Sequence, residues 1–195
     1  MALQQLRVCS LLISFLMVQQ SCGNTYALPP TIIDSNAKVE KLSDGFKFTE
    51  GPVWNPSGFL LFSDIPADTI YKWAPNRKPS IFRRPAGNPN GNTLDKEGRL
   101  ITAQHNRQLT RTEKNGKITI LAERYQGKRL NSPNDIAVKS DGSIYFTDPP
   151  YGIKKEQEEL GFYGIYRWKP DGTLTLLNKE MVRPNGIAFS PCLLY

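Results

Sequence analysis

Four polar residues, each followed by a short apolar stretch, recur along this chain: Glu50, Asn90, Asn134 and Asn185. Their side chains offer one carboxylate and three amides, which are hard oxygen donors. Calcium binds six to eight such oxygens, with water completing its shell. The chain has a single histidine and three widely spaced cysteines, which disfavours zinc and copper. If the fold brings the four residues together, they predict a site for calcium, with other divalent cations as the alternative.

A turn is the competing interpretation of each of these residues by itself. Pro133-Asn134-Asp135 and Pro184-Asn185-Gly186 are turn signals. The run Asn-Pro-Asn-Gly-Asn at residues 88–92 makes a turn interpretation strongest for Asn90. The metal hypothesis therefore depends on equivalent positions across repeats, not on any single residue.

The four residues open segments that resemble one another, spaced about 40 to 50 residues apart, as in propeller blades. Residues 50–62, 90–102 and 134–146 each indicate a strand, a tight turn and a second strand, and residues 185–191 repeat the first strand. Alternating runs follow at 69–73, 108–112 and 164–168. Two of these lead into hairpins through Asn115-Gly116 and Asp171-Gly172, which are strong hairpin signals. Each unit is therefore predicted to contain four strands.

Four-stranded units with this period predict an all-β fold, a β-propeller. The innermost strand of each blade begins at one rim of the central channel, so the four opening residues should face a common axis. The repeats amount to about three blades plus one strand, whereas closed propellers typically have four to eight blades. We therefore expect an open propeller edge that favours self-association. The charged residues 154–160 predict a solvated insertion with one helical turn.

Four motifs carry a family resemblance: residues 48–54 (FTEGPVW), 130–135 (LNSPND), 145–152 (YFTDPPYG) and 183–191 (RPNGIAFSP). Together they resemble the gluconolactonase / senescence marker protein (regucalcin) / luciferin-regenerating enzyme-like family, abbreviated SGL, from about Phe46 to Pro191. The resemblance implies a six-bladed propeller that binds calcium in its channel and hydrolyses lactones or related esters.

The resemblance also implies that Glu50, Asn134 and Asn185 are the calcium ligands. We expect Asp135, which follows a ligand, to orient it. His105 and Asn90 are predicted to bind substrate, although a lone histidine is more often structural. The family's catalytic Asp comes from a later blade and is absent from this sequence, so no catalytic residue is assigned.

The expected function is calcium-dependent hydrolysis of a lactone or sugar-acid ester. Calcium would polarise the carbonyl, and a carboxylate would activate water. Without the later Asp, this activity is expected to be weakened or lost. The alternative is a non-catalytic propeller fragment that binds a sugar-like ligand or a partner protein.

The N-terminus predicts export. Arg7, an apolar run at residues 8–18 and the small residues near Ala27 are typical of a signal peptide over residues 1–27. Residues 28–45 then lead into a partial propeller over 46–195. The product would be secreted or periplasmic, or else a lipoprotein anchored through Cys22. The net charge of +7 is scattered, which argues against nucleic acid as a partner, and no later apolar run is long enough for a membrane span.

Overall fold

The computed structural model describes residue 34 and residues 36–190. The chain divides into two compact units, residues 1–41 and 42–195. The described part of the first unit includes a turn, in which the backbone N–H of Asn36 donates to Asp34 Oδ1. The predicted signal peptide and Cys22 lie outside the described residues. In the part of the chain that the structure covers, no helix is long and apolar enough to cross a membrane.

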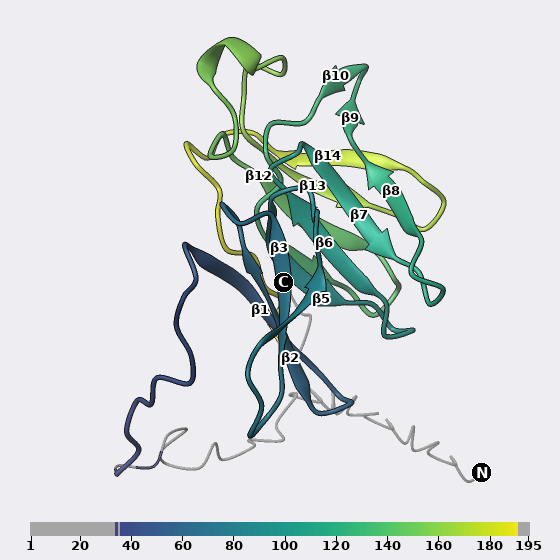
Figure 1. Cartoon of the computed structure of the whole chain (residues 1–195). Helices are drawn as coiled ribbons and strands as arrows, with labels where there is room; N and C mark the ends of the chain where they lie inside the picture. Colours follow the sequence, from purple (N-terminus) through teal and green to yellow (C-terminus); the bar gives the residue numbers. More distant parts are fainter. Residues whose placement is uncertain (1–33, 35, 191–195) are drawn as a thin grey trace, which may run out of the picture. The chain divides into compact units, whose positions relative to one another are not determined.

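Three four-stranded antiparallel sheets follow one another along the second unit (Figure 1). The first sheet contains β1 (Thr49–Asn55), β2 (Phe59–Asp64), β3 (Thr69–Trp73) and β4 (Ser80–Arg83). The second contains β5 (Pro89–Leu94), β6 (Leu100–Gln104), β7 (Gln108–Thr112) and β8 (Ile118–Ala122). The third contains β11 (Ile136–Val138), β12 (Ile144–Asp148), β13 (Gly164–Trp168) and β14 (Leu174–Asn178). Strands pair in chain order within each sheet, which confirms the prediction of propeller blades.

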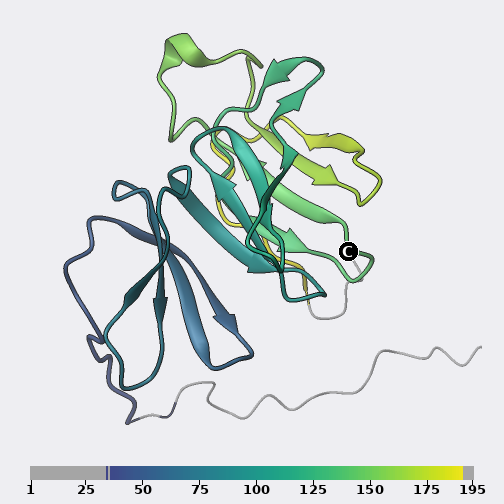
Figure 2. The same cartoon turned by 45° about the vertical axis from the view of Figure 1, so that its right-hand side comes forward.

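The sheets stack because each has two faces with alternating side chains and cannot bury both alone. The inner strands lie side by side, with β1 against β5 and β5 against β11 (Figure 2). Leu61, Ile70 and Leu100 belong to one buried cluster of side chains. A second and larger cluster includes Phe146 and Tyr166, whose rings stack with centroids 5.3 Å apart. Burial of this apolar surface is the main force that joins neighbouring blades.

Two small elements lie at the same end of the sheets (Figure 1). One is a hairpin of β9 (Arg124–Tyr125) and β10 (Lys128–Arg129), which the sequence pattern did not predict. The other is the 3₁₀ helix η1 (Lys155–Gln157), which is the helical turn expected in the charged insertion. Glu159 Oε2 accepts a hydrogen bond of 2.8 Å from the backbone N–H of Arg129 and so ties the two elements together.

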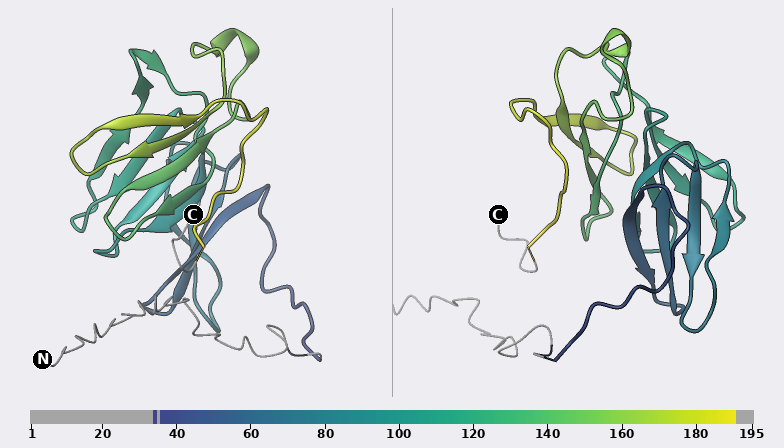
Figure 3. Two further views of the ribbon diagram at one scale, coloured as in Figure 1. Left: turned by 180° about the vertical axis from the view of Figure 1, so that it is seen from behind. Right: turned by 60° about the vertical axis from the view of Figure 1, so that its left-hand side comes forward.

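Residues 185–190 run alongside the third sheet, where the first strand of a fourth blade belongs (Figure 3). The rings of Phe189 and Tyr145 meet edge to face, 4.9 Å apart. The backbone N–H of Ile187 donates to the carboxylate of Asp135. Among the described residues, no strand pairs with this segment, so it is not part of a β-sheet.

Candidate functional site

The structure brings all five predicted metal and substrate residues around one cavity of about 620 Å³. Glu50 lies on β1 and Asn90 on β5, while His105 follows β6, Asn134 precedes β11 and Asn185 follows β14. Apolar side chains, including Phe48 and Ile65, complete the wall. The polar residues come from successive blades, so their convergence follows from the repeat rather than from local sequence.

Each asparagine of this cavity is held through its backbone carbonyl by the blade that precedes it. Because the backbone carbonyl of each asparagine is held by the preceding blade, the side chain of the same asparagine is fixed relative to that blade. The three hydrogen bonds run from Ser63 Oγ to Asn90 O (2.7 Å), from Gly91 N to Asn134 O (2.7 Å), and from Thr147 Oγ1 to Asn185 O (2.6 Å).

Glycines follow the first two polar residues because neighbouring blades approach closely there. A Cβ atom on Gly51 would lie 2.1 Å from Asn90 O, and one on Gly91 would lie 2.5 Å from Asn134 O. Both distances are far below van der Waals contact. The turn interpretation of Asn90 is therefore wrong: Asn90 and Gly91 lie within β5, at a contact between backbones.

Asp135 holds the segment that carries Asn185. Its Oδ2 accepts a hydrogen bond of 2.8 Å from the backbone N–H of Ile187. Its own backbone N–H donates to Thr147 Oγ1 at 3.1 Å. Among the described residues, no hydrogen bond joins its carboxylate to Asn134. The contact of Asp135 with the fourth repeat is one that the sequence did not predict.

His105 is positioned by contacts from two sides. Its Nε2 lies 3.0 Å from Asn90 Nδ2, so a neutral ring accepts a hydrogen bond from the amide. Burial lowers the pKa of His105, which keeps the ring neutral at neutral pH. The loop after β12 packs against the ring so tightly that a Cβ on Gly152 would lie 2.4 Å from His105 Cβ.

The donor set fits a hard cation. Glu50 supplies a carboxylate, and Asn134 and Asn185 supply amide oxygens, which are ligands that calcium accepts. Within residues 34 and 36–190 there is no group of three His, Cys, Asp or Glu side chains that could hold a metal. The side chains that line the cavity include one imidazole and no thiol, so a transition metal that requires several nitrogen or sulfur ligands is poorly matched to it.

Comparison with known proteins agrees with the arrangement of blades and cavity. Residues 48–192 match the family model described as the SMP-30/Gluconolactonase/LRE-like region. The chain belongs to this family.

Individual relatives of this SMP-30/gluconolactonase-family chain include enzymes. It is 36% identical over 180 residues to a gluconolactonase of Zymomonas mobilis. This match covers 82% of this chain and 51% of the relative. It is 36% identical to the solved gluconolactonase of Xanthomonas campestris, with a TM-score of 0.72 over 77% of this chain and 53% of that one. The calcium-binding regucalcin of Agrobacterium tumefaciens shares the fold, with a TM-score of 0.58 and 20% identity over 75% and 48% of the two chains. The chain therefore spans about half the length of these relatives.

A buried polar residue ends the second strand of each blade in this family member. These residues are Asp64, Gln104 and Asp148. Each hydrogen-bonds the segment that leads into the inner strand of its own blade: Asp64 accepts from Lys47 N, Gln104 donates to Ala86 O, and Asp148 accepts from Asn131 N. The recurrence at the strand ends was visible in the sequence, but the partners were not.

Asp148 is predicted to make stability depend on pH. Burial raises its pKa from 3.8 to about 7, and its Oδ1 has no hydrogen-bond partner among the described residues. The folded chain therefore keeps a proton that the unfolded chain releases, so this stabilisation is complete below pH 3.8 and lost as the pH rises through about 7. Between these values, the free energy of unfolding should fall by up to ~1.4 kcal/mol per pH unit relative to Asp148→Asn.

Urea denaturation of both proteins at several pH values measures this difference. The other titrating groups are common to both proteins and cancel in the comparison. Parallel pH profiles would show that Asp148 is ionised in the folded chain across this range.

Proposed function

We propose that this chain forms part of the calcium-binding, substrate-facing site of a lactone hydrolase. The observation that carries the proposal is the convergence of Glu50, Asn90, His105, Asn134 and Asn185 on one cavity. Family membership and the gluconolactonase relatives support lactones as the substrate class. Because the chain spans about half of these relatives, its own activity is part of the proposal.

The residues of the cavity divide into two roles. Glu50, Asn134 and Asn185 would hold the metal. Bound calcium would supply Lewis acidity toward the carbonyl oxygen of the substrate. His105, neutral and next to Asn90, offers hydrogen bonds to hydroxyl groups of a sugar-like ring. Glu50 is a poor base while it is bound to a metal, so we assign no general base among the described residues.

Calorimetry with calcium and an acid-release assay on glucono-δ-lactone test the proposal. We expect calcium binding by this chain and slow or undetectable hydrolysis. Fusion of the chain to the C-terminal half of the Zymomonas relative is expected to give tight calcium binding and rapid hydrolysis. If neither protein binds calcium, the metal assignment fails. If the short chain matches the rate of the fused protein, a base already lies in this chain, with Asp135 and Asp148 as candidates.

Thr147 is predicted to control metal affinity through the position of Asn185. Thr147→Val keeps the shape of the side chain but removes the hydroxyl that donates to Asn185 O and accepts from Asp135 N. Residues that orient ligands typically change metal affinity by 10- to 100-fold, so we expect a loss of ~10-fold or more. Thr147→Ser keeps the hydroxyl and should stay within ~2-fold of the parent. Calcium calorimetry on the three proteins decides, and equal affinities for Val and Ser would show that the hydroxyl does not position the ligand.

A further inference from the structure

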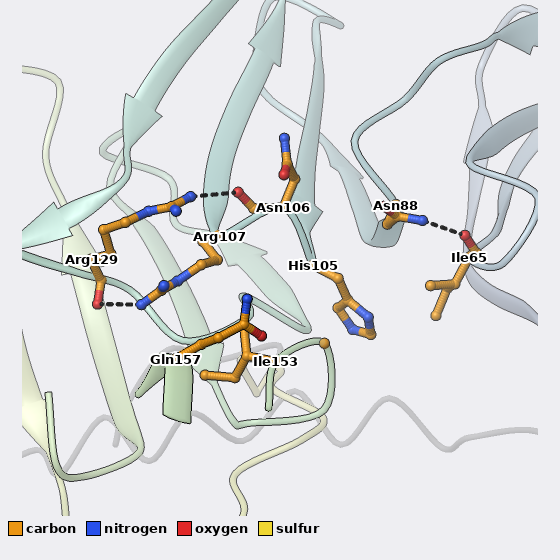
Figure 4. Close-up of a pocket in the computed structure, with 9 residues that line it drawn as sticks. Ile65, Asn88, His105, Asn106, Arg107, Arg129, Ile153 and Gln157 are labelled. Atoms are coloured by element: carbon orange, nitrogen blue, oxygen red, sulfur yellow. Dashed lines mark hydrogen bonds between the residues drawn. The ribbon is translucent and has the colours of Figure 1, made fainter. Parts of the chain in front are cut away.

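A second cavity adjoins the central one. It measures about 370 Å³ and is lined by polar residues that include Asn88, Arg107, Arg129 and Gln157 (Figure 4). His105 and Ile65 line both cavities and therefore form a shared wall. A molecule bound in the central cavity could extend past His105 into the second one.

Arg107 brings a buried cation to this second cavity. Only 8% of its side chain is exposed. Its Nη2 donates to Arg129 O (Figure 4). Its Nε donates to Leu130 O, and the two bonds fix the plane of the guanidinium. Among the described residues no hydrogen bond engages Nη1. A guanidinium held by carbonyls on one side keeps donors for a planar or tetrahedral anion on the other.

Arg129 adds a second guanidinium with donors to spare. Its Nη2 donates to Asn106 O at 3.4 Å, and no other hydrogen bond of the guanidinium is found within the described residues. Glu159 is the carboxylate that faces the pair: its Oε1 lies 3.4 Å from Arg107 Nη2, but it is 39% exposed. Burial lowers the pKa of Arg107 and the charge of Arg129 lowers it further, whereas the carboxylates of Glu159 and Asp148 raise it.

Asp148 and Arg124 are the remaining charged groups that act on Arg107. Burial raises the pKa of Asp148 to about 7, so its carboxylate offsets the cations only in part at neutral pH. Arg124 is exposed on β9 and donates to Gly127 O instead of lining the cavity. Two guanidiniums thus line the second cavity, and the carboxylate of Glu159, which pairs with Arg107, is partly exposed to solvent.

We propose that the second cavity binds an anionic oxygen group, a phosphate or a carboxylate, on a substrate whose ring occupies the central cavity. This inference rests on the proposed function and narrows it to lactones of sugar acids that carry a further anionic group. The shared wall at His105 joins the two binding regions, and the paired guanidiniums supply the recognition.

Calorimetry with four probes tests this inference. Gluconate, 6-phosphogluconate, glucarate and inorganic phosphate are titrated into the chain in calcium-free buffer, because these anions bind calcium themselves. Hydrogen bonds to a charged group support a preference of ~10-fold. We expect 6-phosphogluconate or glucarate to bind at least that much more tightly than gluconate. Tighter binding of 6-phosphogluconate than of gluconate, together with measurable binding of inorganic phosphate, assigns a phosphate site. Tighter binding of glucarate alone assigns a carboxylate site.

Arg129→Gln should abolish this preference, and Arg124→Gln is the matched control. Both substitutions remove one positive charge near the hairpin of β9 and β10, but only Arg129 lines the cavity. Arg107 is not substituted because it also supports the backbone at Leu130. Equal affinity for gluconate, 6-phosphogluconate and glucarate, no binding by any of them, or a preference that survives Arg129→Gln would overturn the inference.

Hydrolysis of neutral glucono-δ-lactone separates this inference from the proposed function. If glucono-δ-lactone is hydrolysed but probes with a second anionic group bind no more tightly than gluconate, the anion site is rejected and the lactonase proposal stands. A clear preference that Arg129→Gln removes, with no hydrolysis by the chain or its fusion, rejects the lactonase proposal and leaves the anion site in place.

Discussion

Glu50→Gln is expected to lower the calcium affinity of this chain by ~100-fold or more, which corresponds to ~2.7 kcal/mol. Glu50 is the carboxylate among the residues around the central cavity, and Asn134 and Asn185 are neutral. The affinity of oxygen sites for calcium depends strongly on the number of charged ligands. Glutamine keeps the length of the side chain and one oxygen but removes the charge.

Calcium calorimetry on the parent and on Glu50→Gln measures this effect, and Glu156→Gln is the matched control. Glu156 is exposed on η1 and lines none of the cavities described above, so the control makes the same change in net charge. The control should bind calcium as the parent does. Full affinity in Glu50→Gln would remove Glu50 from the ligand set and, with it, the metal assignment of the cavity.

Gly91→Ala is expected to destabilise the chain by about 3 kcal/mol, at the upper end of what overpacking costs. The added Cβ would lie 2.5 Å from Asn134 O and 2.9 Å from Asp135 Cα. Both atoms belong to backbone and cannot turn aside as a flexible side chain would. The same Gly91 donates its N–H to Asn134 O, so a forced separation of the blades also breaks that hydrogen bond.

Gly186→Ala is the matched control for this prediction. Gly186 follows Asn185 as Gly91 follows Asn90, but a Cβ there would lie 3.8 Å from Asp135 Oδ2, an ordinary contact. Urea denaturation should show a change of at most ~0.5 kcal/mol for Gly186→Ala. If both alanine variants are equally stable, the blades can separate at Gly91 without cost and the close approach does not position Asn134.

Most of the blade structure could be predicted from the sequence because its signals are local. The alternating runs at 69–73, 108–112 and 164–168 coincide with β3, β7 and β13. The Asn-Gly and Asp-Gly turns close hairpins in which Gly116 and Gly172 adopt positive φ angles of 82° and 86°. The hairpin of β9 and β10 was missed because strands of two residues are too short to show a period.

The convergence of the candidate site residues could also be predicted, but only from their equivalent positions in successive repeats. Asn90 in isolation favoured a turn, and its equivalence to Glu50 and Asn134 favoured the cavity where the structure places it. The second cavity was not predicted. Arg107 and Arg129 both lie between the openings at Asn90 and Asn134, but they are 22 positions apart and neither occupies a repeated position, so no pattern connected them.

The sequence by itself determined the blade period, the strands and the polar residues that open each blade, because alternation, turn residues and repetition act over a few neighbouring positions. The tertiary structure decided what holds those residues in place. Ser63 and Asn90 are 27 positions apart, and Thr147 and Asn185 are 38 apart. A hydroxyl and a carbonyl at such separations meet only when stacking of the blades brings their backbones together, so the contacts that position the site follow from blade packing.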